Sequence, residues 1–242
     1  MQIKKLFIAL GIVLPLHMQG QNFLIKDAPE VIESYVNQFN REDNELYKQG
    51  IPNCGASDFL RKNIPFFECP DKELEKTYYF RWWTYRKHIK KTPDGFVITE
   101  FLPDVPWAGK YNTISCAANH HFYEGRWLRN AEILSDYASF WFSGSGNPRL
   151  YSFGAADAIY NYYLIHNDKM LLADLYPKLK DNFAKWEEEK RDSTGMFWQV
   201  DDRDGMEMSV SGHLSEGGRG YRPTINSYMY GEAVALAKIA SI

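Results

Sequence analysis

The sequence predicts an all-α protein in which apolar helices alternate with amphipathic ones, as in a helical toroid built from helix pairs. Residues 152–166 are apolar or small almost all round, which is typical of an inner helix. Residues 169–190 carry leucines and aromatic residues on one side and charges on the other, which is typical of an outer helix. The predicted helices are fewer than a closed toroid of six helix pairs needs. We therefore expect a toroid that is incomplete at the C-terminus.

The N-terminus has the pattern of a secretory signal. Lys4 and Lys5 precede an apolar stretch, residues 6–16, that is too short to span a bilayer. This pattern predicts a signal peptide over residues 1–20 and a secreted or periplasmic protein, with a retained membrane anchor as the alternative. Residues 21–70 are predicted to be an N-terminal extension, with one helix from about Ala28 to Tyr47 and an irregular segment over 50–70.

The predicted toroid domain covers residues 71–242. Asp71 is a candidate cap for a helix over 74–89, which carries aromatic residues on more than one side and is therefore buried or lines a pocket. The basic run 86–91 is expected to lie on a solvated helix end. Residues 96–99 predict a short strand, and helices are expected over 113–127 and 131–142. Thr224 is a candidate cap for a final helix that ends near Ala240.

The amino-acid composition limits the classes of molecule that this protein is expected to bind. The net charge of -3 does not suggest a surface for nucleic acid. Aromatic residues make up 16% of the chain, and aromatic rings stack well on the apolar faces of sugars. The tryptophans that are candidates for sugar stacking, each with burial in the core as the alternative, are Trp82, Trp83, Trp127 and Trp198.

An acidic stretch over residues 201–209 is the strongest candidate for chemistry. Four carboxylates lie between positions 201 and 207, and methionines flank Glu207 on both sides. An apolar wall disfavours the charged form of a carboxyl group and raises its pKa, so Glu207 suits a general acid. Asp204 is the second candidate for this role. The alternative is an acidic turn that leads into a helix.

Four residues outside this stretch and one within it are further candidate sugar contacts. Arg126 and Arg222 can hold hydroxyl groups or an anionic substrate, or can pair with Asp201 and Asp202 to orient the loop. Asn226 and Tyr228 can line the pocket from the start of the last helix, or can act in capping. Asp202 is itself a candidate contact.

No metal or other cofactor is expected. No His or Cys spacing resembles a zinc site, and the acidic stretch lacks the ligand positions of a calcium-binding loop. Cys54 and Cys69 can close a short loop in an oxidising compartment, although three buried free thiols explain the sequence equally well.

Four ordered motifs between about Thr77 and Ile242 resemble the (α/α)6-barrel glycosidases of the mannosylglycerate hydrolase-like group, which are related to glycoside hydrolase families 63 and 37. The motifs are NHHFYEGRWL at 119–128, SFGAADA at 152–158, FWQVDDRDGME at 197–207 and YRPTINSY at 221–228. The resemblance implies an inverting hydrolase with two carboxyl groups. It places the acid in a Gly-Met-Asp type motif, which is Gly205-Met206-Glu207 here, and the base in a much later part of the barrel.

The predicted function is a secreted inverting glycoside hydrolase, of which these residues form the N-terminal part, acting on an oligosaccharide or glycoside. The expected partner is a carbohydrate substrate, with no nucleic acid and with no membrane after signal cleavage. The alternative is a non-catalytic protein that binds carbohydrate or that uses an open edge of the helical barrel for interaction.

Overall fold

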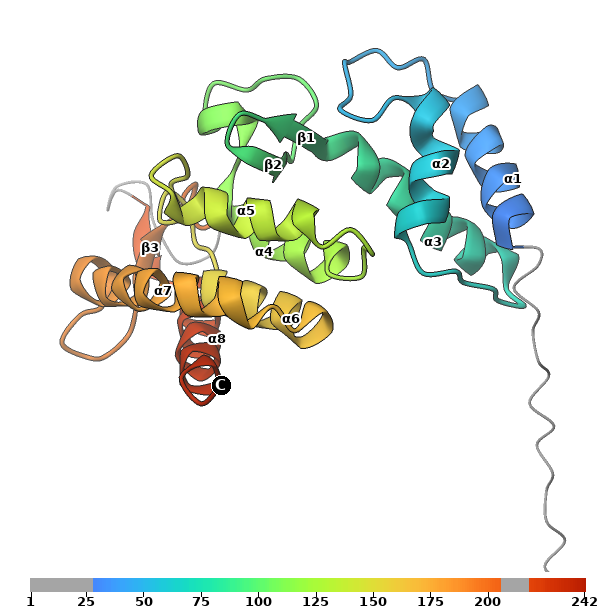
Figure 1. Ribbon diagram of the computed structural model, residues 1–242. Helices are drawn as coiled ribbons and strands as arrows, with labels where there is room; N and C mark the ends of the chain where they lie inside the picture. Colours follow the sequence, from blue (N-terminus) through green and yellow to red (C-terminus); the bar gives the residue numbers. More distant parts are fainter. Residues whose placement is uncertain (1–27, 206–217) are drawn as a thin grey trace, which may run out of the picture.

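The computed structural model describes residues 28–205 and 218–242, and its helices form two groups on either side of a β-hairpin (Figure 1). The helices of this described part are α1 Ala28–Arg41, α2 Asn53–Asn63, α3 Lys72–Tyr85, α4 Ser115–Gly125, α5 Glu132–Phe142, α6 Ala155–His166, α7 Lys169–Lys190 and α8 Pro223–Ile239. Two antiparallel hairpins pair β1 Ile89–Thr92 with β2 Gly95–Ile98, and β3 Trp198–Val200 with β4 Arg219–Tyr221. Short 3-10 helices, η2 Arg86–His88 and η3 Lys110–Asn112, precede β1 and α4.

Helices α4, α6 and α8 form an inner arc, because α6 packs against both of its neighbours, and α5 and α7 contact each other beside this arc. The buried face of α6 carries three alanines with Ile159 and Tyr162. Asp168 caps α7 by accepting a hydrogen bond from the Leu171 N–H at 3.0 Å. The predicted alternation of inner and outer helices is confirmed, and the fold is that of an all-α toroid.

The second group packs α1 and α2 against α3. The predicted cap of α3 is confirmed, since the Asp71 carboxylate accepts hydrogen bonds from the N–H groups of Glu73 and Leu74. Four aromatic residues of α3 are buried, as the sequence predicts for a helix inside the core, whereas Phe80 is exposed; the buried ones are Tyr79, Trp82, Trp83 and Tyr85. Ile32 of α1 belongs to the same apolar cluster as Ile159 of α6. The domain boundary at residue 70 stays a prediction.

Two expectations for this region are wrong. Residues 53–63 form α2 rather than an irregular segment, because Pro52 precedes the first turn, where proline is compatible with a helix, and Ala56 and Leu60 bury one face. The basic run is not a solvated helix end. Arg86 is fully buried, and its guanidinium donates to the side chains of Gln49, in the loop after α1, and Asn53, at the start of α2. Burial lowers the pKa of Arg86 to about 10.

Gly50 lies directly against β1. A Cβ added at this position would overlap the carbonyl oxygen of Ile89. Replacing Gly50 with alanine should therefore lower the free energy of unfolding by about 1–3 kcal/mol. In helix α2, a Cβ at Gly55 would make an ordinary contact of 3.6 Å with Ile51, so Gly55→Ala should raise stability by about 0.5–1 kcal/mol. Urea unfolding of the two variants measures this contrast, and a stabilising Gly50→Ala would contradict the close approach.

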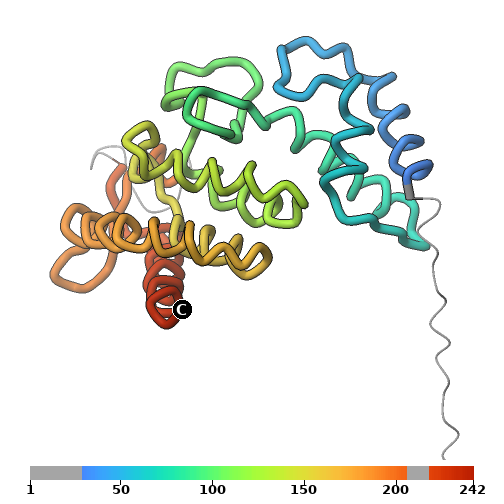
Figure 2. The backbone as a smooth tube through the Cα atoms, in the orientation of Figure 1, coloured from blue at the N-terminus to red at the C-terminus, as the bar shows by residue number. Residues whose placement is uncertain are grey.

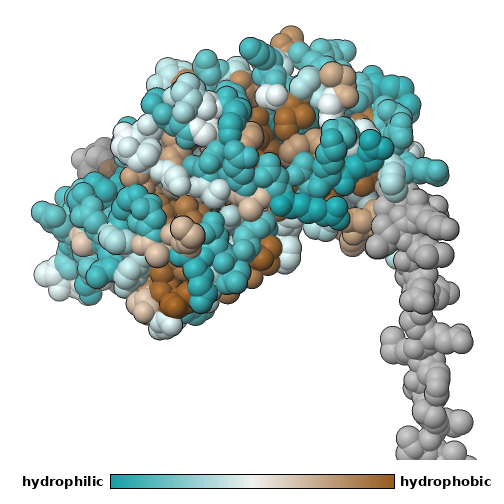
Figure 3. All heavy atoms as spheres, in the orientation of Figure 1, coloured by the Kyte–Doolittle hydropathy of each residue, from teal (hydrophilic) through white to brown (hydrophobic). Residues whose placement is uncertain are grey.

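The surface shown in Figure 3 combines hydrophilic and apolar residues. Figure 3 shows a mainly hydrophilic face in which apolar residues emerge in separate patches. Within residues 28–205 and 218–242, no helix combines the length and the hydropathy that crossing a membrane requires. All three cysteines are free, and Cys54 is exposed rather than buried. The predicted signal peptide over residues 1–20 lies outside the described residues.

Candidate active site

The acidic stretch follows β3, and its described residues, 201–205, form a loop that we call the acidic loop. This loop lies where the first turns of three inner helices meet. Gly205 sits against Cys116 in the first turn of α4, where an added Cβ would come within 3.3 Å of the Cys116 Cβ. Ser152, just before α6, donates its N–H to the carbonyl oxygen of Arg203 at 2.8 Å. Thr224, in the first turn of α8, interacts with Asp204. One short loop therefore connects α4, α6 and α8.

Asp204 is the buried carboxyl group of this loop, with 4% of its surface exposed. The Ser152 hydroxyl donates to Asp204 Oδ1 at 2.5 Å. Asp204 Oδ2 is buried and has no hydrogen-bond partner among the described residues. Burial raises the pKa of Asp204, and the hydrogen bonds from Ser152 and Thr224 oppose this rise. The site thus favours the protonated form of a carboxyl group more than water does, which is a property of general acids.

Glu207, the first candidate for the acid, lies outside the described residues, as do Met206 and Met208. The structure describes the two residues that border this segment. Gly205 has φ +68° and Gly218 has φ +66°, a backbone conformation that favours glycine. Both glycines therefore suit the turns at which the segment leaves and rejoins the described chain.

Arg222 joins the two strands that lead into and out of this segment. Its guanidinium forms a buried ion pair with Asp201, donates from Nε to the carbonyl oxygen of Gln199 at 3.2 Å, and donates from Nη2 to the carbonyl oxygen of Gly218 at 2.9 Å. Only 1% of the Arg222 side chain is exposed. The structural alternative for Arg222 is thus confirmed with Asp201 as its partner, whereas Asp202 is exposed.

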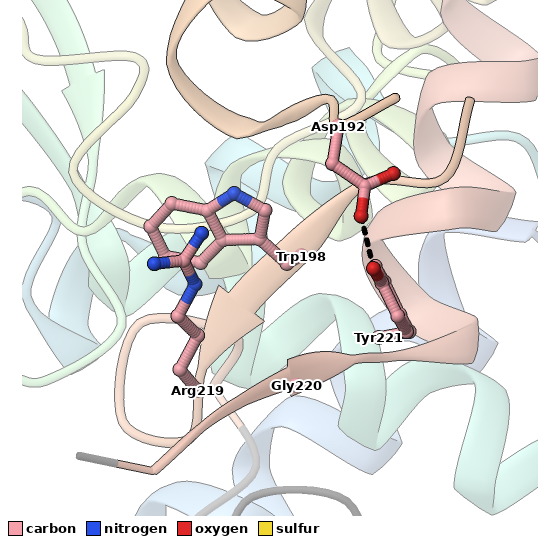
Figure 4. A pocket seen from close by; sticks show the side chains of 5 residues that line it. All are labelled: Asp192, Trp198, Arg219, Gly220 and Tyr221. Atoms are coloured by element: carbon pink, nitrogen blue, oxygen red, sulfur yellow. Dashed lines mark hydrogen bonds between the residues drawn. The ribbon is translucent and has the colours of Figure 1, made fainter. Parts of the chain in front are cut away.

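Trp198 lies at the outer side of the β3–β4 hairpin, in a pocket of about 250 Å³ (Figure 4). The Arg219 guanidinium carbon is 3.7 Å from the ring centroid, and Lys190 Nζ is 3.9 Å from it. Two cations therefore lie within 4 Å of the centre of this ring. Across the pocket, the Tyr221 hydroxyl donates to the Asp192 carboxylate. Arg219 and Lys190 therefore compete with a sugar for contact with the Trp198 ring.

A family model for the mannosylglycerate hydrolase MGH1-like glycoside hydrolase domain matches residues 110–242, which is more than half of the chain. The chain belongs to this glycoside hydrolase family. A solved structure named "Sialidase" is similar at 40% sequence identity with a TM-score of 0.80, over 88% of this chain and 20% of that chain. This chain therefore spans about a fifth of the length of that protein. No curated protein matches the chain.

The four tryptophans proposed as sugar contacts have different environments. Trp82 and Trp83 are buried in α3, and Trp83 Nε1 donates to Asn40 Oδ1 at 2.8 Å, so the alternative of core burial is confirmed for both. Trp127 is 46% exposed, and the guanidinium carbon of Arg126 lies 5.2 Å from the centroid of the Trp127 ring. The structure does not bring these three residues to the acidic loop, and their role as sugar contacts stays a prediction.

Arg126, Asn226 and Tyr228 make structural contacts within the fold. Arg126 Nη1 donates to Asn161 Oδ1 at 2.7 Å, so its partner lies in α6 and not in the acidic loop. The Asn226 side chain accepts a hydrogen bond from the Phe197 N–H at 2.9 Å and donates to the Phe197 carbonyl oxygen at 2.8 Å. Tyr228 packs in the small apolar cluster around Trp186. Asn226 thus fastens the start of α8 to the strand that leads into the acidic loop.

The start of α8 differs from the prediction. Arg222 occupies the N-cap position and Pro223 the first helical position, so Thr224 is not the cap. Thr224 instead interacts with Asp204. The sequence offered a signal for this arrangement, because proline is favoured at the first helical position and not before it.

Sequence reasoning missed Glu232, a fully buried carboxyl group on α8. Glu232 Oε1 accepts a hydrogen bond from the Asp157 N–H in the first turn of α6 at 3.0 Å, and Glu232 Oε2 has no partner within the described part of the chain. Gly154, at the N-cap of α6, has no side chain to cap this turn, so Glu232 supplies the acceptor from the neighbouring helix. Tyr123 of α4 donates to the Asp157 carboxylate and completes a network across all three inner helices. A single glutamate in the apolar sequence of α8 was the available signal.

Replacing Glu232 with glutamine should flatten the pH dependence of stability. Burial, with a smaller effect of Asp157, raises the pKa of Glu232 from 4.5 to about 8. The folded state then keeps a proton that the unfolded chain releases above about pH 4.5, so the free energy of unfolding falls by up to about 1.4 kcal/mol per pH unit as pH rises toward 8. Glutamine keeps the acceptor oxygen and cannot ionise. Urea unfolding at several pH values between about 5 and 8 checks this, and parallel curves for the two proteins would contradict it.

Among the described residues, no group of three or more His, Cys, Asp or Glu side chains is arranged to hold a metal ion.

Proposed function

We propose that this chain supplies the general-acid side of an inverting glycoside hydrolase that is secreted or periplasmic and acts on an oligosaccharide or glycoside. The observation that carries the proposal is the acidic loop at the first turns of α4, α6 and α8, where burial raises the pKa of Asp204. A raised pKa favours the protonated form of a carboxyl group, and this form can donate a proton to the leaving oxygen of a glycosidic bond. The family assignment supports a glycoside as the substrate.

Glu207 is the proposed acid and Asp204 the second candidate. An inverting reaction also needs a carboxylate that activates water on the opposite face of the sugar, roughly 6.5–9.5 Å from the acid. Asp201 is held in its ion pair with Arg222, and Asp202 is exposed, so neither suits this role. We propose that the base comes from a later part of the barrel, as the resemblance implies.

The test is the configuration of the released sugar. The protein is incubated with a panel of neutral and acidic glycosides, including mannosides and sialosides, and the anomer of the first product is followed by proton NMR. We expect the product with inverted configuration. Azide added at high concentration can replace the activated water, so turnover that needs azide would identify an acid without its base. A product with retained configuration would overturn the inverting mechanism.

Carbohydrate binding without turnover is the second candidate, and the engagement of Asp201 by Arg222 favours it because this carboxylate is not available as a base. Calorimetric titration with the same glycosides distinguishes the two. Binding without hydrolysis, with or without azide, and with equal affinity in the Glu207→Gln variant would support the binding function over the enzyme.

A further inference from the structure

A groove of about 630 Å³ lies away from the acidic loop, between the loop that follows α1 and the loop that follows β2. Figures 1 and 2 show these two loops at the same edge of the molecule, one on each side of β1. Residues 47–50 form one wall, residues 102–104 and Tyr111 form the other, and residues 90–92 of β1 form the floor. The groove is more than twice as large as the pocket beside Trp198.

Buried polar contacts fix both walls of the groove. In the first wall, the Gln49 side chain accepts a hydrogen bond from the buried Arg86 guanidinium. The carbonyl oxygen of Ile51, just after this wall, accepts a second one. In the second wall, the buried Asn112 side chain accepts from the Val105 N–H at 3.0 Å and donates to the carbonyl oxygens of Phe101 and Pro103 at 3.0 and 2.9 Å. The groove is therefore largely formed before any ligand arrives, which is the usual state of a binding site.

Backbone strain gathers around the same groove. In the described residues, four residues other than glycine have positive φ, and three of them, Glu45, Tyr111 and Asn112, lie in its two bordering loops. Such conformations persist only where the surrounding structure enforces them, and they cluster at ligand sites. Tyr111 itself lines the groove, and its backbone has φ +59°. This clustering distinguishes the groove from an ordinary surface hollow.

The charges of the lining define the ligand. Lys48 and Lys90 line the groove, and neither forms an ion pair within the described residues. Lys91 is engaged by Glu132 and Asp136, and Asp104 is the acidic residue of the lining. These two cations have no ionic partner in the described part of a chain whose net charge is -3, so they attract an anion locally rather than through the field of the whole protein.

Aromatic rings complete the lining, because Tyr47 on one wall is 46% exposed and Tyr111 lies on the other. Tyrosine presents an apolar face beside a polar hydroxyl, which suits a sugar ring. We propose that this groove binds an acidic oligosaccharide, with Lys48 and Lys90 contacting its anionic groups and the exposed ring of Tyr47 packing on one of its sugar rings. The proposal rests on the glycoside hydrolase function only for the class of ligand, since no residue of the acidic loop lines the groove.

The experiment measures the affinity of the 242-residue chain for an alginate hexamer, which carries carboxylates, by calorimetric titration. The double variant Lys48→Ala/Lys90→Ala should bind about tenfold more weakly. The matched control Lys169→Ala/Lys180→Ala removes two lysines from the distant helix α7 and should bind like the unmodified chain. Cellohexaose, which is neutral, should bind far more weakly than alginate, and raising the salt concentration should weaken alginate binding.

Four outcomes overturn the proposal: no binding of any acidic oligosaccharide, equal affinity for cellohexaose, equal losses in the two double variants, or tighter lysine-dependent binding of a single-stranded oligonucleotide of equal charge. A carrageenan hexamer, which carries sulfates and no carboxylates, distinguishes the source of the anion, and lysine-dependent binding of either hexamer supports the groove. If the chain hydrolyses glycosides but does not bind either hexamer, the groove proposal fails while the proposed glycoside hydrolase function stands.

Discussion

Replacing Glu207 with glutamine should lower kcat by roughly 10²–10⁴-fold while leaving sugar affinity within a few-fold, because glutamine has nearly the same shape and cannot donate the proton that the leaving oxygen needs. The loss should depend on the leaving group. A dinitrophenyl glycoside, whose leaving group needs little protonation, should lose much less activity than an alkyl glycoside. Steady-state kinetics with the two substrates, with azide present where turnover requires it, measures this difference.

Asp204→Asn is the matched variant for this prediction. Asparagine keeps an oxygen that can accept the Ser152 hydrogen bond, so the loop should remain folded, which urea unfolding checks. If Glu207 is the acid, Asp204→Asn should lower the activity on both substrates to a similar extent. The opposite pattern, with full turnover in Glu207→Gln and a leaving-group dependence in Asp204→Asn, would move the acid role to Asp204.

Replacing Arg222 with methionine should lower the free energy of unfolding by about 3–5 kcal/mol, since it leaves the partly buried Asp201 carboxylate without its ion-pair partner. The carbonyl oxygens of Gln199 and Gly218 lose their donors as well. A loss of this size is a large fraction of the total stability of a typical domain. Urea unfolding followed by tryptophan fluorescence measures it.

Arg219→Met is the control, because Arg219 lies three positions earlier on β4 and its guanidinium stacks on Trp198 at an exposed site. Its loss should cost no more than about 1 kcal/mol. Equal losses of stability in the two variants would contradict the prediction, because they would show that the ion pair between Arg222 and Asp201 contributes no more than the exposed contact between Arg219 and Trp198.

Local patterns in the sequence were sufficient for most of the helices. The apolar residues of 152–166 and the one-sided pattern of 169–190 predicted α6 and α7, because helix periodicity is set within a few turns. Asp71 predicted the start of α3 for the same reason, since a cap acts on the next turn. Short-range signals of this kind are encoded in neighbouring residues.

Contacts between distant segments decided the rest. Arg86 and Lys87 read as a solvated basic run, yet the loop over residues 43–53 buries both. The partners of Asp204 are Ser152, from a segment 52 residues earlier, and Thr224, in the following helix. Glu232 caps a helix 75 residues away from it in the chain.

The sequence alone determined the family motifs, the alternating helices and the position of the acidic stretch, because each is a local pattern. Only the tertiary structure decided which carboxyl groups are buried and which partners they have. Burial and pairing depend on segments that are far apart in the chain, and these two properties set the pKa of a carboxyl group and hence its chemistry.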